Sequence, residues 1–338
     1  MYYITDNGRG HATRSVAIIR ELQKLNFEIT IRNSNSVQFL SNSLPNVKIV
    51  NGLTDVGISL GTNGISINEI QTKLNVNNWL DKLNYYAKIE CDIISKIDPN
   101  LIISDISIMP FLAAKQMKKK SIAISNFSWY DVLKFLPEDK LEFLKNVYDI
   151  PNGVIQLPIG TSMNHFERKK KVGLVSRIPQ ISRKTLRTKF GINDTDTVLT
   201  FAMGASEIRI NEIPKNNIKI LSMNTKIKNV PNVINLTNWD EGQEIIAASD
   251  LVICKCGYGI ISECLNNGVF FNYLADDNHL EQKAMSQELS KNGWGKRITF
   301  EELKQFQFNN IDEKHQNIKR IPQDTKSVIK YISEFLEN

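Results

Sequence analysis

His11 is the first residue whose type and position could do chemistry, and it follows the sequence NGRG at residues 7–10. An apolar run precedes this sequence and a segment with helical spacing follows it, which predicts a turn from a strand into a helix. Glycines allow such a turn to be tight. Because imidazole groups titrate near neutral pH, a histidine at this turn can accept a proton from a hydroxyl group. The alternative interpretation is that His11 only caps the helix.

Asp105 is a second candidate, because it ends the apolar run LIISD at residues 101–105. The carboxyl ends of parallel strands meet at one edge of a sheet, so this carboxylate could lie close to His11. There it could hydrogen-bond the far nitrogen of the imidazole, fix its tautomer and raise its basicity. Asp105 could equally cap the helix that follows it, and the sequence leaves both interpretations open.

The sequence DLVICKCGYGIISE at residues 250–263 carries the strongest motif, a strand, a glycine turn and a helix. The start of such a helix offers free amides and a positive dipole end to a diphosphate, and Gly257 and Gly259 would admit a close approach. Glu263 follows Gly259 by about one helical turn, where its carboxylate can accept hydrogen bonds from a ribose diol. The alternative for Glu263 is a structural role as a capping-box glutamate.

Two polar loops fit the same predicted site. Residues 201–206, FAMGAS, follow a strand and place Gly204 and Ser206 where a loop could close over phosphates. Residues 276–282, DDNHLEQ, also follow a strand, and Glu281 and Gln282 could bind sugar hydroxyls there. The competing interpretation of the second loop is a polar connection with a helix cap.

No metal or cofactor is expected. Cys91, Cys254, Cys256 and Cys264 are the four cysteines, and they are predicted to be reduced packing residues, because no fourth zinc ligand and no usual zinc spacing accompanies them. The chain has no D-x-D motif flanked by strand residues that would suggest a metal-bridged donor, although the pair at 276–277 keeps that point open.

Short runs rich in Ile, Val and Leu alternate with longer stretches of helical spacing, which predicts an α/β fold with parallel sheets. We expect two Rossmann-like doubly wound domains that face each other across a cleft. The first spans residues 1–156, a polar linker follows at 157–171, and the second spans 172–322. The amphipathic segment 323–338 could fold back across the first domain. The active site is expected in the cleft, beyond the carboxyl ends of the strands.

The composition limits the partners. The net charge is +6, but the basic runs at 118–120 and 168–171 carry no interleaved aromatic residues, so they are predicted to be solvated faces and not a nucleic-acid site. No apolar run is long enough to cross a bilayer, and the first residues lack the charged segment followed by an apolar segment that a secretory signal has. A cytoplasmic protein is therefore expected. The positive charge leaves open an anionic ligand or a loose association with the inner face of the membrane.

The motifs carry a family resemblance. GRGHATRS at residues 8–15 resembles the G-x-G-H-x-x-R opening of glycosyltransferases with the GT-B fold, including the group that transfers N-acetylglucosamine in peptidoglycan synthesis. KCGYGIISE at 255–263, with DDNHLEQ, resembles their donor-binding signature. The chain is also similar to the glycosyltransferase-like region of arabinokinase-type proteins at GHATRS, at IISDI (102–106), at AISNFSW (123–129) and at the G-Y-G turn.

The resemblance implies roles for individual residues. It puts His11 near the acceptor, in agreement with the role predicted above of a catalytic base with Asp105 as its partner. Arg14, Asn126 and Trp129 are predicted on the acceptor side. In related proteins, the loop that corresponds to residues 237–239 lies beside the nucleobase. The donor-binding residues implied in this way are Gly10, Gly204, Ser206, Asn238, Trp239, Gly257, Tyr258, Gly259, Glu263, Glu281 and Gln282.

Two positions depart from the family pattern. Cys256 stands where a proline or similar residue is usual before G-Y-G, and the MGAS loop is poorer in glycine than is common. The resemblance implies transfer of a hexosyl or N-acetylhexosaminyl group to an acceptor hydroxyl from a nucleotide sugar, which is a substrate and not a cofactor. A histidine base and the lack of a flanked D-x-D motif favour transfer with inversion and without a metal. The acceptor, whether glycan, lipid-linked or small molecule, stays open. The alternatives are a nucleotide-sugar epimerase of the same fold and a non-catalytic nucleotide-sugar binding protein.

Overall fold

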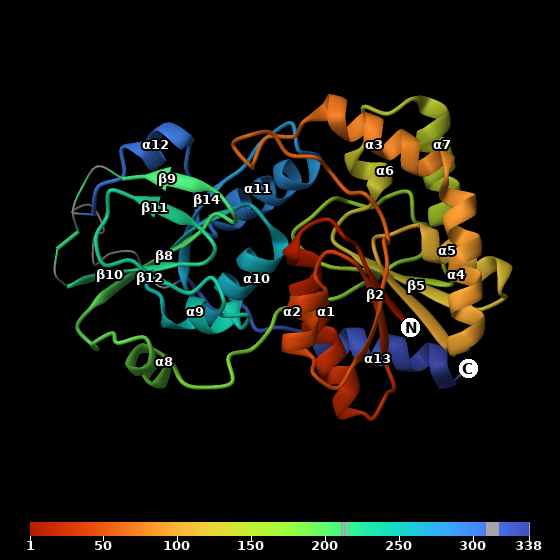
Figure 1. Cartoon of the computed structure of the whole chain (residues 1–338), viewed down its shortest axis with the longest axis horizontal. Helices are drawn as coiled ribbons and strands as arrows, with labels where there is room; N and C mark the ends of the chain where they lie inside the picture. The colour runs from red at the N-terminus through yellow and green to blue at the C-terminus, as the bar shows by residue number, and fades with distance from the viewer. Residues whose placement is uncertain (211, 213, 216, 309–317, 338) are drawn as a thin grey trace.

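The computed structural model describes residues 1–338 except 211, 213, 216, 309–317 and 338. Two parallel sheets form the centres of two lobes, and helices cover each sheet (Figure 1). This arrangement confirms the predicted α/β class with two Rossmann-like halves. In the described part of the chain, no helix combines the length and the apolar character needed to cross a bilayer.

The first sheet has seven strands, all paired in parallel. In spatial order they are β3 (Lys48–Asn51), β2 (Thr30–Asn33), β1 (Tyr2–Ile4), β4 (Leu101–Asp105), β5 (Lys120–Ser125), β6 (Gly153–Gln156) and β7 (Lys170–Lys171). The helices of this half are α1 (Arg9–Lys24), α2 (Val37–Ser43), α3 (Glu69–Asp81), α4 (Leu83–Ile97), α5 (Met109–Gln116), α6 (Trp129–Val132) and α7 (Glu138–Tyr148).

The central strands of this sheet are apolar on both faces, as parallel strands between helices must be. In β4, Ile103 packs into the core on the side of α1, whereas Ile102 packs into the core on the side of α5. The edge strand β7 lies within the segment predicted as a linker. It consists of two exposed lysines, and such charges keep a sheet edge from pairing further.

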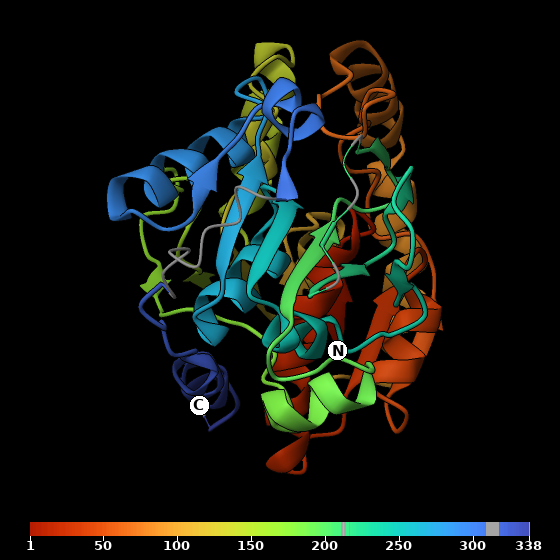
Figure 2. The same cartoon turned by 90° about the vertical axis from the view of Figure 1, so that its left-hand side faces the viewer.

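The second sheet has six strands, in the order β12 (Ile234–Asn235), β10 (Ile218–Ser222), β8 (Thr197–Ala202), β13 (Leu251–Lys255), β14 (Phe270–Leu274) and β15 (Lys296–Arg297). Figure 2 shows it from the side of the second lobe, with the green-to-blue strands toward the viewer. A separate pair is formed by β9 (Glu207–Arg209) and β11 (Lys226–Lys228). The helices are α8 (Arg183–Lys189), α9 (Gly242–Ala248), α10 (Tyr258–Asn267), α11 (Leu280–Asn292), α12 (Phe300–Lys304) and α13 (Thr325–Glu337).

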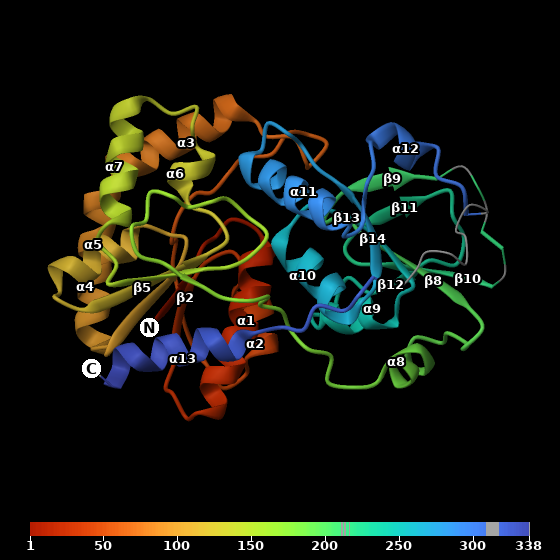
Figure 3. The same cartoon turned by 180° about the vertical axis from the view of Figure 1, so that it is seen from behind.

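Helix α13 returns from the second half of the chain to the first. It lies beside α1 (Figure 3), and its residues Val328 and Ile332 are buried in the same core as Ile18 and Leu22 of α1. Residues 173–174 and 323–324 run together before it, with an isolated bridge between Leu174 and Gln323. Two crossings of the chain therefore join the halves.

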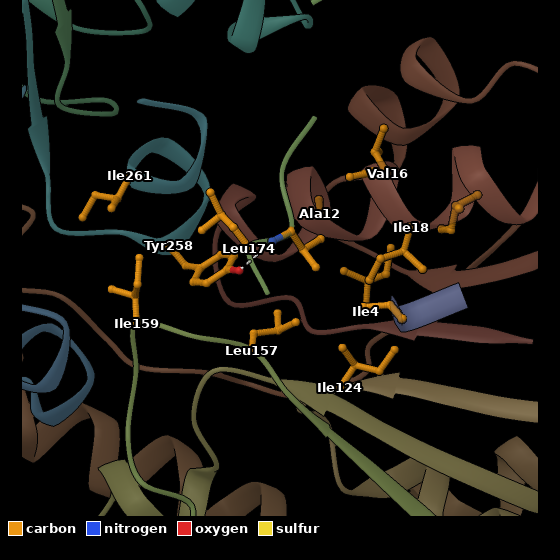
Figure 4. Close-up of a cluster of buried hydrophobic side chains, with 14 of the residues drawn as sticks. Ile4, Ala12, Val16, Ile18, Ile124, Leu157, Ile159, Leu174, Tyr258 and Ile261 are labelled. Carbon is orange, nitrogen blue, oxygen red and sulfur yellow. Dashed lines mark hydrogen bonds between the residues drawn. The ribbon is translucent and has the colours of Figure 1, made fainter. Parts of the chain in front are cut away.

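One apolar core runs through the contact between the halves. It includes Ile4 and Ala12 from the first half and Tyr258 and Ile261 from the second, as Figure 4 shows. Helices α1 and α10 pack against each other at this contact. The starts of these two helices, which carry the first and the strongest sequence motifs, are thereby brought together.

Candidate active site

His11 and Asp105 lie in contact. The strands β1 and β4 are neighbours, with Ile4 in register with Asp105, so the turn after β1 reaches the end of β4. His11 Nδ1 is 2.9 Å from Asp105 Oδ1, and both side chains are buried. Neither residue is a helix cap, because α1 has Gly8 and α5 has Ile108 at the N-cap position. The geometry thus supports the orienting interpretation of Asp105.

Arg14 completes this network from one turn further along α1. Its Nε donates to Asp105 Oδ2 at 2.7 Å, and its Nη1 donates to Asn126 Oδ1 at 2.5 Å. Burial alone would raise the pKa of the Asp105 carboxyl, but Arg14 and His11 lower it to about 2. Asp105 is therefore a fixed negative charge at neutral pH.

The tautomer of His11 follows from its surroundings. Nδ1 lies 2.9 Å from Asp105 Oδ1 and 2.8 Å from Arg14 Nη2. Arg14 Nη2 has Asp105 Oδ1 and Ser125 Oγ as other acceptors, and an ionised carboxylate is the stronger acceptor for the imidazole proton. The tautomer with the proton on Nδ1 satisfies this network best, and it leaves Nε2 as a proton acceptor.

Asn126 connects this network to the second half of the chain. Its Oδ1 accepts from Arg14, and its Nδ2 donates to Glu281 Oε1 at 3.1 Å. Glu281 lies in the first turn of α11, so the two predicted residues meet at the boundary between the halves. Trp129 is buried in the first half of the chain, and its Nε1 donates to Asp55 Oδ2 at 3.1 Å.

Asp55 is a residue that the sequence motifs do not reveal. Burial raises the pKa of its carboxyl to about 7, and hydrogen bonds from Thr5 and Trp129 oppose that rise.

The ring of Phe127 makes edge contacts with both His11 and Trp129, at centroid distances of 5.6 and 5.3 Å. The contact with Phe127 adds an apolar neighbour to the His11 ring beside its polar partners Asp105 and Arg14.

A cavity of about 410 Å³ lies between the halves, next to the start of α10. Six of the predicted donor-binding residues line it: Gly10, Gly204, Trp239, Gly257, Gly259 and Glu263. It is also lined by side chains that the motifs did not single out, among them Arg9, Thr13, Phe39, Arg177, Asn224 and Lys255. No side chain caps α10 at Gly257, so its first amides lack a capping acceptor.

The two glycines of the G-Y-G turn serve different needs. A β-carbon on Gly257 would meet no atom within 4 Å, so its backbone faces open space. A β-carbon on Gly259 would lie 2.5 Å from Thr13 Oγ1 and 3.1 Å from the Cα of Gly10. The requirement at Gly259 is therefore the close packing of α10 on α1, whereas Gly257 leaves room for a ligand.

Glu263 lies in the wall of the cavity and pairs with Arg177, whose Nε is 2.8 Å from Glu263 Oε1. Burial raises the pKa of the Glu263 carboxyl, and Arg177 opposes that rise. Glu263 is the sixth residue of α10 and takes no part in capping it. Arg177 in turn donates to the Asp240 carbonyl at 2.7 Å, which holds the loop after Trp239.

Five of the predicted donor-binding residues lie outside the cavity lining. The ring of Tyr258 is buried beneath the Arg14 guanidinium, and its hydroxyl accepts from the Val175 amide at 3.1 Å, because this first residue of α10 faces α1. Gln282 Oε1 accepts from the Asp276 amide at 3.0 Å and so holds its own loop. The other three are Ser206, Asn238 and Glu281.

A loop of the first half reaches into the second. Ile65 is 2% exposed and packs with Leu199 and Phe201 of β8. The amide of Ile67 donates to Asp276 Oδ2 at 3.0 Å. Asp277 pairs instead with Arg297, at 3.0 Å. Both aspartates of the DDNHLEQ sequence thus have partners within the protein.

The cysteines of the second half lie in apolar surroundings. Cys254, Cys256 and Cys264 are buried and unpaired, and Cys91 is partly exposed. Within the described residues, no group of three or more His, Cys, Asp or Glu side chains is arranged to hold a metal ion.

The sequence profile of glycosyl transferase family 1 matches residues 1–313. The chain belongs to this family. L-arabinokinase of Arabidopsis thaliana is 25% identical over 296 residues, which cover 83% of this chain and 28% of that protein. The chain therefore spans little more than a quarter of that relative's length. These matches confirm the resemblance that the motifs indicated.

Solved glycosyltransferase structures share the fold of this family member. MurG of Acinetobacter baumannii superposes with a TM-score of 0.55 at 13% identity, over 99% of this chain and 98% of that one. SnogD of Streptomyces nogalater superposes with a TM-score of 0.61 at 11% identity, over 99% and 98%. At these identities the likeness shows the two-domain GT-B architecture.

Proposed function

We propose that this glycosyltransferase takes a sugar from a nucleotide-sugar donor and attaches it, with inversion, to an acceptor hydroxyl. One observation carries the proposal. A β-carbon on Gly10 would lie 3.7 Å from the Gly259 amide nitrogen, so the residue before His11 adjoins the first turn of α10. A base oriented by a carboxylate and a helix start suited to a diphosphate are therefore adjacent.

The reaction that fits this arrangement is a single displacement. Nε2 of His11 takes the proton of the acceptor hydroxyl while that oxygen attacks the anomeric carbon. The bond from this carbon to the diphosphate breaks, and the uncapped amides and dipole of α10 stabilise the leaving oxygen. Asp105 stabilises the imidazolium that forms, because its own carboxyl stays ionised. Attack opposite the leaving group inverts the anomeric centre.

The cavity residues suggest how the donor lies. The diphosphate would sit at Gly257, the ribose diol at Glu263 and the nucleobase beside Trp239. Glu281, which contacts Asn126 of the His11 network, is the group best placed for the transferred hexosyl or N-acetylhexosaminyl unit. Gln282 would contribute only through Nε2, because its oxygen is already bonded to the Asp276 amide.

Metal independence is part of the proposal, since α10 supplies the positive field for the leaving group. We expect transfer to continue when the enzyme is dialysed against EDTA and assayed in EDTA. Activity that disappears in EDTA and returns with Mg²⁺ or Mn²⁺ would contradict this part and leave the role of His11 unaffected.

The function is tested with purified protein and a panel of UDP-, GDP-, ADP- and dTDP-sugars. A thermal-shift screen finds the donor, because a ligand that binds only the folded state raises the apparent stability. That donor is then incubated with glycan, lipid-linked and small-molecule acceptors, and release of nucleoside diphosphate and the anomeric configuration of the product are measured. An epimerase would convert the sugar without releasing nucleotide, and a binding protein would do neither.

A further inference from the structure

We propose that Lys255 binds the diphosphate of the donor, in a phosphate pocket whose walls come from both halves of the chain. The assignment rests on the proposed function and adds to it Lys255, a cationic residue of the glycine motif to which the sequence assigned no role. Lys255 ends β13, two residues before Gly257, and lines the cavity between the halves.

Two glycines surround the Lys255 ammonium. A β-carbon on Gly64 would lie 3.1 Å from Lys255 Nζ, and one on Gly204 would lie 3.3 Å from it. Both glycines have positive φ values, +66° and +64°, which side chains rarely adopt. Gly64 comes from the first half and Gly204 from the second. The ammonium therefore lies close against two loop backbones, one from each half, and a side chain in place of either glycine would crowd it. The space for an anion is the cavity itself, which Lys255 and Gly204 both line.

Lys255 lacks an anionic partner. Across the described residues it makes no ion pair and no hydrogen bond, whereas Arg177 in the same cavity pairs with Glu263. Lys255 is half-buried, and this burial lowers the pKa of its ammonium. A partly desolvated charge without a counter-charge is unfavourable, unless a ligand supplies the opposite charge.

A hydroxyl group faces the same place. The point that a β-carbon on Gly64 would occupy lies 3.3 Å from Ser206 Oγ as well as 3.1 Å from Lys255 Nζ. Ser206 Oγ donates to the Met203 carbonyl at 2.9 Å, and rotation of this hydroxyl would direct its single proton at a phosphate oxygen. Together with the uncapped start of α10, an ammonium and a hydroxyl match the two charged phosphates of a nucleoside diphosphate.

Calorimetric titration of the full chain with UDP, GDP, ADP and dTDP tests the assignment. For each nucleotide that binds the wild type, Lys255→Met should lower the affinity by about tenfold to a hundredfold, the effect of losing a charged hydrogen bond. Lys255→Gln should show a similar loss. Lys226→Met is the matched control, because Lys226 is an exposed lysine of strand β11 in the same half of the chain that pairs with Glu207, and it should change the affinity by less than twofold.

The melting temperature without ligand separates binding from folding. Removing an unpaired, half-buried ammonium should leave the melting temperature of Lys255→Met equal to or above that of the wild type. Unchanged nucleotide affinity in a folded Lys255→Met protein overturns the assignment to Lys255 and leaves the proposed function standing. A wild type that binds none of the four diphosphates overturns the proposed function, and the Lys255 assignment with it.

Discussion

The His11 network and the cavity between the halves both lie near the contact between α1 and α10, and their charges are arranged in opposite ways. Asp105 is fully buried, and Arg14 and His11 both contact its carboxylate. In the cavity, the ammonium of Lys255 has no partner among the described residues, and no side chain caps α10. One region is complete without a ligand, and the other lacks an anion.

The pKa directions show the same difference. Burial acts against the charged form in both regions. At Asp105 it is outweighed by Arg14, so the pKa falls to about 2, whereas at Lys255 burial acts alone and lowers the pKa. A group that must hold a base in one orientation gains from a fixed set of partners. A group that must release and rebind a charged ligand gains from having none.

Replacing His11 should give the largest effect. His11→Ala should lower turnover by roughly a hundredfold to ten-thousandfold, the usual contribution of a positioned base, while donor affinity stays nearly unchanged. His11→Gln should be as slow, because its amide can donate to Asp105 but cannot take a proton. Turnover, donor affinity and melting temperature are measured on the same samples. Full turnover in either folded variant would end the assignment of His11 as the base.

For residues that line the cavity, we expect substitutions to weaken nucleotide binding and not to lower turnover. Glu263→Gln should weaken nucleotide binding by about tenfold, since a neutral amide is a poorer acceptor for ribose hydroxyls, while its oxygen still accepts from Arg177. Glu90→Gln is the matched control, because Glu90 forms a buried pair with Arg32 in the first half, at 2.6 Å. Equal nucleotide affinity in wild type and Glu263→Gln would remove the ribose assignment.

The sequence predicted most of the fold. Apolar runs marked the central strands of both sheets, because strands buried on both faces contain few polar residues. It did not predict β7, β9, β11 or β15, which have two or three residues and no apolar pattern. The first sheet therefore extends into the segment predicted as a linker.

The candidate site was predictable where one strand-to-helix turn positions each group. Such turns led to His11 and to Gly257, but not to the pairing of charges between distant segments. Nothing in the sequence shows that Arg177 pairs with Glu263 or that Lys255 stays unpaired. Tyr258 was assigned to the donor because it lies in the glycine motif, yet the packing of α10 on α1 buries it.

Acid should act on the His11 network through Asp105. A carboxyl whose pKa is lowered by folding, here from 3.8 to about 2, stabilises the fold above the unfolded value. That contribution is lost as the pH falls from about 4 to about 2. Between pH 5 and pH 3, the free energy of unfolding of the wild type should fall by about 1 kcal/mol more than that of Asp105→Asn. Urea unfolding at each pH measures the free energy of unfolding of both proteins. The same pH dependence in the two would contradict the lowered pKa of Asp105.

The smallest expected effect concerns the loop that the first half contributes to the second. Ile65→Val removes one buried methylene group beside Leu199 and Phe201, so the free energy of unfolding should fall by about 1 kcal/mol if the docked loop belongs to that core. Ile70→Val is the matched control, because Ile70 is 85% exposed and its variant should stay within about 0.5 kcal/mol of the wild type. Urea unfolding of the wild type, Ile65→Val and Ile70→Val measures these differences in the free energy of unfolding. If both variants match the wild type, the loop opens without unfolding the core, and the approach of Gly64 to Lys255 then belongs only to the docked form of the loop.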